Sequence, residues 1–209
     1  MEQQPSNISQ VNIVSLSYAD IIDESKDLSQ KIKEAFGPEG YGICIVTDVP
    51  QYVELRRNLL PLAQKLAKLP ADTLKNYEFP DYFYTVGWSH GREKFLNQRD
   101  FSKGSFYANP QYDNIHGDAE IKFGETFAPN VWPTKDVPEL EKAFKELGCL
   151  IVDVGAKLSK HIDAYIQKEV PAFPAGKVTQ IVKESKCCKA RLLHYFPSIF
   201  SHKSLNNCL

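Results

Sequence analysis

The longest periodic segment of this sequence, "PELEKAFKELGCLIVDVGAKLSKHIDAYIQKE", predicts one helix over residues 139–168. Its apolar side chains recur at steps of three and four residues, which places them on one face of an α-helix. They are Leu140, Phe144, Leu147, Ile151, Val154, Leu158, Ile162 and Tyr165. Asp136 and Glu139 form a capping-box pattern at its start. A helix of about eight turns with a single apolar face is expected to lie on a large surface.

Shorter elements are predicted before this helix. Residues 11–16 alternate apolar and polar side chains and favour a short strand. Residues 28–36 carry apolar side chains at four-residue spacing, so a helix is expected there, ending at Gly37. Residues 40–50, "GYGICIVTDVP", are rich in aromatic and β-branched side chains and predict a buried strand, which Asp48 and Pro50 end.

Residues 52–69 predict a second helix, with Pro61 as a local irregularity. Residues 71–138 are aromatic, punctuated by glycine and proline, and only weakly periodic, which indicates a binding loop, a lid or an ordered coil along the surface. Near the other end, "KVTQIVKESK" predicts a short helix. Residues 190–197 predict a final core strand with neighbours on both sides.

The composition excludes several classes of partner. A net charge of -1 gives no electrostatic reason to expect nucleic acid or a membrane surface, and no apolar run approaches a membrane span. The first ten residues are polar and carry no secretion signal, and they are expected to be disordered. Five scattered cysteines do not suggest a disulfide scaffold, so a soluble cytoplasmic setting is expected.

Common catalytic motifs are absent from the sequence. It contains no G-x-S-x-G, no phosphate-binding loop and no G-x-G-x-x-G. Ser89 and His90 are adjacent, but no third group is identifiable that would make them a nucleophile and its base. Cys187 and Cys188 are interpreted as packing or exposed thiols, and His194 as a histidine satisfied within the sheet.

The triplet His116-Gly-Asp118 matches part of the two-histidine, one-carboxylate triad that holds non-haem iron. His161 is a candidate third ligand. The placement argues against this site, because His161 lies in the middle of the long helix while "DNIHGDAE" reads as an exposed loop. Such triads are normally carried on rigid strands, where two ligands two residues apart point the same way.

Three stretches together resemble the isopenicillin N synthase-like group of 2-oxoglutarate and iron(II)-dependent oxygenases. They are "GPEGYGICIVTDVP", the run from "VGWSHGREKF" through "KGSFYANP" and "NVWP" to "PELEKAF", and "KARLLHYFP". The resemblance implies an α+β fold: the N-terminal helices and strands of a double-stranded β-helix (jelly-roll) oxygenase. Residues 11–197 would form this portion, with 139–168 as its long helix and 190–197 as the first barrel strand.

In that family the iron and 2-oxoglutarate ligands come later in the chain than this strand. The residues after Pro197, "SIFSHKSLNNCL", contain His202 but no acidic residue and are interpreted as an unrelated tail, 198–209. Arg191 and Tyr195 match the strand pattern, whereas family positions that touch the co-substrate fall on His194 and Phe196. We therefore expect no catalytic, cofactor-binding or metal-binding residue in this chain, with the barrel largely missing.

The sequence thus predicts a C-terminally truncated or degenerate oxygenase-family chain without activity of its own. Intact relatives couple decarboxylation of 2-oxoglutarate to oxidation of a substrate. Two alternatives remain open: an active non-haem iron oxidoreductase that uses His116 and Asp118, and a non-catalytic interaction module. Self-association through an exposed apolar helix face and an unpaired strand edge is also expected.

Overall fold

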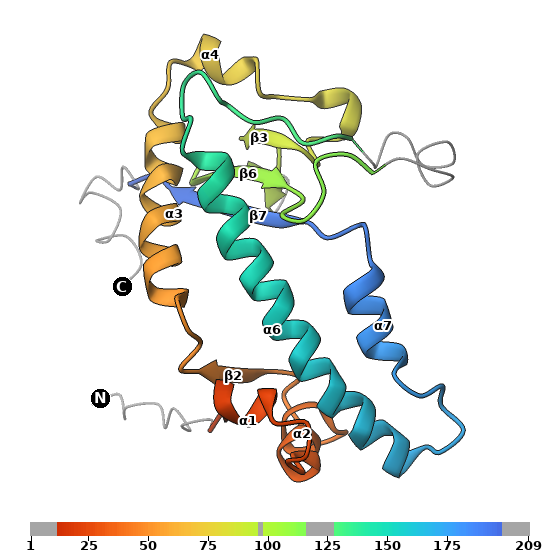
Figure 1. The fold of residues 1–209 in the computed structure, drawn as a ribbon. Coiled ribbons are helices and arrows are strands. Elements are labelled where there is room, and N and C mark those ends of the chain that lie inside the picture. Colours follow the sequence, from red (N-terminus) through yellow and green to blue (C-terminus); the bar gives the residue numbers. More distant parts are fainter. Residues whose placement is uncertain (1–11, 96–97, 116–127, 198–209) are drawn as a thin grey trace, which may run out of the picture. The chain divides into compact units, whose positions relative to one another are not determined.

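The computed structural model describes residues 12–95, 98–115 and 128–197. The chain forms two compact units, each assembled from two separate stretches of sequence. Unit 1 comprises Met1–Pro50 and Val152–Glu184, and unit 2 comprises Gln51–Ile151 and Ser185–Leu209. Figure 1 shows the elements coloured along the sequence.

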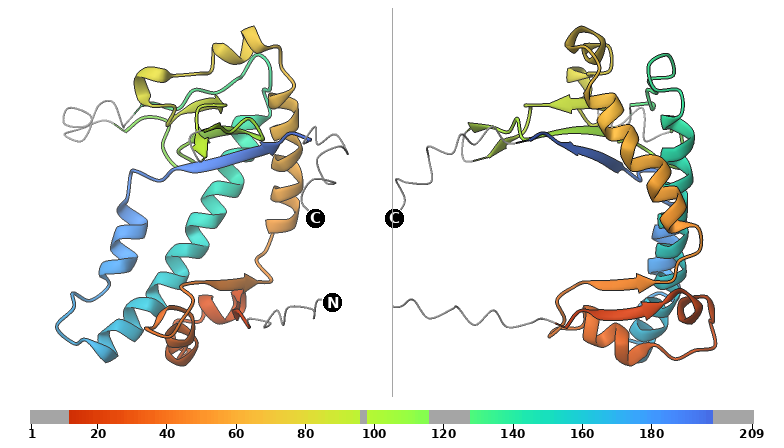
Figure 2. Two further views of the ribbon diagram at one scale, coloured as in Figure 1. Left: turned by 180° about the vertical axis from the view of Figure 1, so that it is seen from behind. Right: turned by 90° about the vertical axis from the view of Figure 1, so that its left-hand side faces the viewer.

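Unit 1 contains a pair of parallel strands, β1 and β2, in which Val14 lies opposite Cys44. The two strands run side by side in Figure 2. Its elements are β1 (Val14–Ser17), α1 (Tyr18–Ile22), α2 (Ser29–Phe36), β2 (Cys44–Thr47), the second half of α6 (Leu140–Glu169) and α7 (Lys177–Glu184).

The core of unit 1 brings the first stretch of the chain against α6. Its buried side chains are Leu16, Ile21, Leu28 and Ile32, and the partly buried side chains that pack against them from α6 are Val154, Leu158, Ile162 and Tyr165. Local signals set the ends of the helices: the Asp20 backbone N–H donates to Ser17 Oγ over 3.1 Å at the start of α1. At the end of α2, the Gly37 backbone N–H donates to Lys33 O.

The strand predicted over residues 40–50 is present but is not buried as expected. Ile43 and Ile45 are 49% and 47% exposed. The reason is that, over the described residues, β2 pairs with β1 alone in a sheet of two strands, which leaves one side of β2 exposed.

Unit 2 contains an antiparallel sheet with the strand order β3-β6-β7. The strands are β3 (Gly87–His90), β6 (Lys103–Ala108) and β7 (Ala190–Tyr195), and a small separate pair is formed by β4 (Lys94–Phe95) and β5 (Gln98–Arg99). The helices are α3 (Tyr52–Ala67), α4 (Ala71–Lys75), the short 3-10 helix η1 (Pro80–Tyr82) and the first half of α6.

One face of this sheet forms the core of unit 2. Trp88, Phe106 and Leu192 project from the three strands into a cluster that α3 and α6 complete. The Phe106 and Phe144 rings meet edge to face with their centroids 5.9 Å apart. The further members from the two helices are Leu59, Ala63, Leu66, Ala67, Leu140, Ala143 and Leu147.

Gly104 on β6 allows this packing, because its missing side chain leaves room for Trp88. A Cβ atom at Gly104 would lie 2.1 Å from Trp88 Cη2, well inside van der Waals contact. Trp88 is 2% exposed and packed within the core, so the indole cannot move aside to make room for a side chain at position 104.

The long helix was predicted almost to the residue, and α6 spans Leu140–Glu169. The structure divides its apolar face between two cores: Leu140, Phe144 and Leu147 belong to unit 2, and the later positions belong to unit 1. Ile151, the last residue of α6 in unit 2, is 54% exposed. The apolar side chains of α6 are thus buried in unit 2 and partly buried in unit 1, and self-association through the part that remains exposed stays a prediction.

The capping box predicted at the start of α6 is replaced by tertiary contacts. The Tyr77 hydroxyl donates to Asp136 Oδ2 over 2.5 Å, and Lys65 Nζ pairs with Glu139 Oε2 at 2.9 Å. Both partners lie far away in sequence, so local spacing could not reveal them. The helix predicted over residues 52–69 is confirmed as α3, which retains Pro61 in its interior.

The prediction that residues 71–138 lack regular structure is wrong. This segment supplies α4, η1 and the strands β3 to β6. The final strand is confirmed as β7, but within the described residues it pairs with β6 alone rather than having neighbours on both sides. Among the described residues, no helix is long and apolar enough to cross a membrane.

Candidate functional site on the polar face of the sheet

The face of β3-β6-β7 opposite the core is polar. Alternation along each strand sends every second side chain to this face, and the strand register sets them in rows. Ser89 on β3 lies opposite Ser105 on β6, and Tyr107 on β6 lies opposite Arg191 on β7. The further residues of this polar face are Lys103, Leu193 and Tyr195.

Arg191 is the centre of the polar face. Its Nε and Nη2 atoms donate to Ser105 Oγ over 3.1 and 2.9 Å, and Nη2 also donates to Glu93 Oε1 over 2.5 Å. The guanidinium lies over the Tyr107 ring with its carbon 5.2 Å from the ring centroid. These contacts hold the guanidinium group in one orientation on the sheet. They involve Nε and Nη2, which leaves Nη1 as the nitrogen that can donate to a bound acceptor.

A second cation, Lys103, joins Arg191 through shared carboxylates. Lys103 Nζ pairs with Glu93 Oε2 at 2.9 Å and with Asp100 Oδ2 at 2.5 Å. The Tyr107 hydroxyl donates to Glu93 Oε1 over 3.2 Å. Glu93 thus accepts hydrogen bonds from residues of two different strands, since Arg191 is on β7 while Lys103 and Tyr107 are on β6.

The network keeps its acidic groups ionised. The hydrogen bond from Lys103 holds the pKa of Glu93 below its ordinary value. Hydrogen bonds from Lys103 and Ser102 lower the pKa of Asp100, and the pKa of Lys103 is raised by Asp100 and Glu93. Burial raises the pKa of Tyr107, so this phenol stays protonated at neutral pH. The site therefore presents paired charges of both signs at fixed positions on one face of the sheet.

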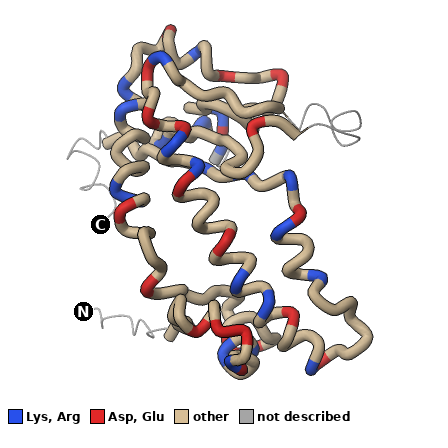
Figure 3. The backbone as a smooth tube through the Cα atoms, viewed as in Figure 1, with Lys and Arg blue, Asp and Glu red and all other residues tan. Residues whose placement is uncertain are grey.

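Charged residues elsewhere are intermixed along the chain. In Figure 3, Lys and Arg alternate with Asp and Glu over the described parts of both units. The polar face is distinguished by the close linkage of its charges rather than by their sign.

The residues considered for an iron site are not brought together within the described chain. His116, Asp118 and His202 lie outside the described residues. His161 is in unit 1, where it is buried with its Nε2 atom 3.1 Å from Ile21 O. Over residues 12–95, 98–115 and 128–197, no group of three or more His, Cys, Asp or Glu side chains could hold a metal ion. In the described part of the chain, His161 is therefore a structural residue of unit 1.

The other candidate residues do not form a catalytic group with their neighbours in the described chain. Ser89 and His90 are consecutive on β3 and project to opposite faces, so they do not form a catalytic pair. His90 Nε2 contacts Phe101 O at 3.1 Å. His194 packs edge to face against Phe196, with ring centroids 4.9 Å apart. Cys187 and Cys188 are free thiols.

Sequence analysis identified Arg191 only as a match to a strand pattern and missed Glu93, Lys103, Ser105 and Tyr107. A signal for three of them was present, because "KGSFYA" alternates Lys103, Ser105 and Tyr107 with glycine, phenylalanine and alanine. This period of two is typical of a half-buried strand. Glu93 lies in the turn between β3 and β4, and nothing local indicates its partners.

Comparisons with known proteins identify the fold. Neither a protein-family model nor a curated protein matches the chain. A crystal structure of a "putative 2OG-Fe(II) oxygenase family protein" from Caulobacter crescentus is similar, with a TM-score of 0.67 and 20% sequence identity. The match covers 91% of this chain, which spans only 58% of the length of that structure. The chain therefore has a mixed helix and strand fold shared with part of that oxygenase-family protein.

Proposed function

We propose that residues 12–197 form the scaffold part of a 2-oxoglutarate and iron(II)-dependent oxygenase of the isopenicillin N synthase-like group. The observation that carries this proposal is the fold similarity, at a TM-score of 0.67, to a protein described as a member of the 2OG-Fe(II) oxygenase family. The sequence resemblance supports the finer assignment, since "KARLLHYFP" coincides with β7 and "SFYANP" with the end of β6.

In this proposal the polar face of β3-β6-β7 lines the chamber where such an oxygenase holds its substrate. Two features support this role. The opposite face is filled by the core of unit 2, so the polar face is the side of the sheet left for a ligand. The charges on it are fixed by one another, and a rigid guanidinium such as Arg191 suits recognition of a carboxylate.

We also propose that the chain alone does not catalyse oxidation. The sequence supports this proposal, because the family's ligand pattern is not matched by His202 and its neighbours. The alternative is a non-haem iron oxidoreductase using His116 and Asp118. A non-catalytic interaction module remains a further alternative.

Anaerobic calorimetry with iron(II), followed by measurement of 2-oxoglutarate consumption in air, separates these functions. We expect no stoichiometric iron binding and no turnover by the chain. Stoichiometric binding that is lost in both His116→Ala and Asp118→Ala, but kept in the control His90→Ala, would contradict the proposal and support the iron enzyme. The control is chosen because the Nε2 atom of His90 contacts Phe101 O and no family co-substrate position falls on this residue.

A further inference from the structure

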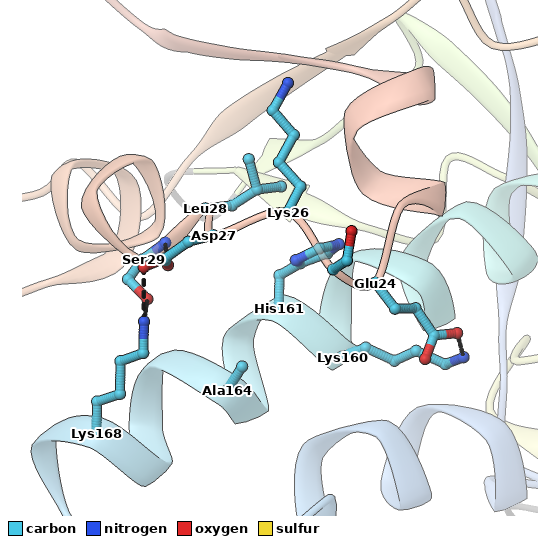
Figure 4. Close-up of a pocket in the computed structure, with 10 residues that line it drawn as sticks. Glu24, Lys26, Asp27, Leu28, Ser29, Lys160, His161, Ala164 and Lys168 are labelled. Atoms are coloured by element: carbon cyan, nitrogen blue, oxygen red, sulfur yellow. Dashed lines mark hydrogen bonds and ion pairs between the residues drawn. The ribbon is translucent and has the colours of Figure 1, made fainter.

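Two cavities differ in whether their polar groups already have partners. One, of about 280 Å³, lies in unit 1 between α6 and the loop that joins α1 to α2. Its charged side chains are paired with one another, since Lys160 pairs with Glu24 (Figure 4). Lys168 pairs with Asp27 in the same way. The other cavity, of about 100 Å³, lies in unit 2 and retains thiol and amine groups that have no such partners.

The cavity in unit 2 lies where the chain enters β7. Its lining combines apolar residues, among them Ile115 and Ala128, with Cys187, Cys188 and Lys189. Both cysteines are free thiols, of which the first is exposed and the second is half-buried. Ordinary ligand pockets begin at about 300 Å³, so this cavity is too small for such a ligand and suits a single ion or a very small molecule.

The backbone ahead of β7 allows both cysteines to line the same cavity. Neighbouring residues of a strand point to opposite faces, but β7 begins only at Ala190. Before it the chain bends, and the Cys187 backbone N–H donates to Ser185 Oγ over 3.3 Å. The Asn109 side chain donates from Nδ2 to Lys186 O over 2.8 Å, which ties this bend to the end of β6. The two thiols are thus held next to each other outside the regular strand.

Lys189 adds a positive charge beside the two thiols. Within the described residues its ammonium group makes no ion pair and no hydrogen bond. The ammonium group is close enough to the Cys187 sulfur for the two to attract each other once the thiol is ionised. Two thiolates that share a singly charged cation carry one net negative charge, and Lys189 can neutralise it.

We propose that Cys187 and Cys188 form a binding site for copper(I). Thiolate sulfur is a soft ligand that favours this ion, and copper(I) accepts two ligands where structural zinc takes four. Over the described residues no group of three or more His, Cys, Asp or Glu side chains could hold a metal, so a two-ligand ion fits the donors that are present. On binding, each thiol releases its proton to water and forms one sulfur–copper bond, with no change of oxidation state.

Anaerobic titration of the reduced full chain against the copper(I) complex of bicinchoninate tests this site. The parent chain should withdraw one copper ion from the chelator and keep it in excess glutathione, and Cys187→Ser and Cys188→Ser should each lose this binding. Cys44→Ser and Cys149→Ser are the matched controls, because these free thiols do not line the cavity. A parent chain that takes up no copper(I), or a Cys187→Ser variant that binds it as the parent does, would overturn the proposal.

Two further measurements test the ligands and the lysine. X-ray absorption at the copper edge should show two sulfur neighbours, and a copper ion bound through nitrogen would contradict the assignment. Lys189→Gln should weaken copper(I) binding about tenfold, as the loss of a group that supports metal ligands does. Lys186→Gln is its control, because it removes the same charge three residues earlier, from a side chain that does not line the cavity. Equal affinities of these two variants would refute the part given to Lys189.

Discussion

Replacing Gly104 by alanine should destabilise unit 2, because the new methyl group meets Trp88. The Cβ would stand 2.1 Å from Cη2 and 2.5 Å from Cζ2 of the indole, against about 3.5 to 4.0 Å for carbon atoms in contact. Relief requires a movement of more than about 1 Å in a ring that is 2% exposed. Overpacking of this kind costs about 1–3 kcal/mol, and the buried setting favours the upper part of that range.

Tryptophan fluorescence during urea unfolding measures the stability of unit 2. The chain has two tryptophans, and both Trp88 and Trp132 belong to unit 2. The midpoint for Gly104→Ala should fall with little change in slope. In a Trp88→Phe background the smaller ring leaves room for the methyl group, so the same substitution should cost at least about 1 kcal/mol less.

Gly155→Ala is the matched control for this experiment. Gly155 lies in α6, and a Cβ there would meet no atom within 4 Å. Because alanine is the better helix former, this variant should be neutral or stabilised by up to about 1 kcal/mol. The reasoning is refuted if Gly104→Ala lies within about 0.5 kcal/mol of the parent chain, or if its cost is the same beside Phe as beside Trp.

Three further predictions concern charge and association. In Lys103→Met, carbon-detected NMR of the carboxyl groups should show the pKa of both Glu93 and Asp100 rising, since Lys103 is the main cause of their lowering; an unchanged pair would refute the network. The hydrogen bond to Asp136 raises the pKa of Tyr77 to about 12, so this contact favours folding below about pH 10 and is lost towards pH 12. Tyr77→Phe should therefore flatten the loss of stability over that interval, and unaltered alkaline unfolding would count against it. Ultracentrifugation should reveal concentration-dependent self-association through the edge of β7, weakened in Leu193→Lys, whereas a strictly monomeric parent chain would exclude it.

Of the helices, α2, α3, α6 and α7 were predictable because their signals are local, whereas the short helices α1 and α4 were not predicted. Spacing of three and four residues defines α6, and Gly37 ends α2 as a C-terminal glycine should. The division of α6 between two cores was not predictable, because Phe144 and Val154 look alike in a periodic pattern. Only the chain segments packed against them differ.

The candidate site was harder to predict because its contacts are distant in sequence. Ser105 and Arg191 are 86 residues apart, and Glu93 and Arg191 are 98 apart. Strand register brings them together, and register depends on the whole sheet. For His161, the sequence indicated a helical position but not the acceptor at Ile21 or the loop that encloses the ring.

The sharing of α6 has a consequence for how the chain reaches its folded state. The helix has 30 residues and is about 45 Å long. Unit 1 needs the second half of α6. During synthesis, residues 12–50 therefore cannot complete their core until about a hundred further residues have emerged. A protease cut near Ile151 would divide the helix and deprive each unit of one of its two stretches. Neither unit can therefore be excised as a single contiguous fragment, and both should be lost together when this helix is severed.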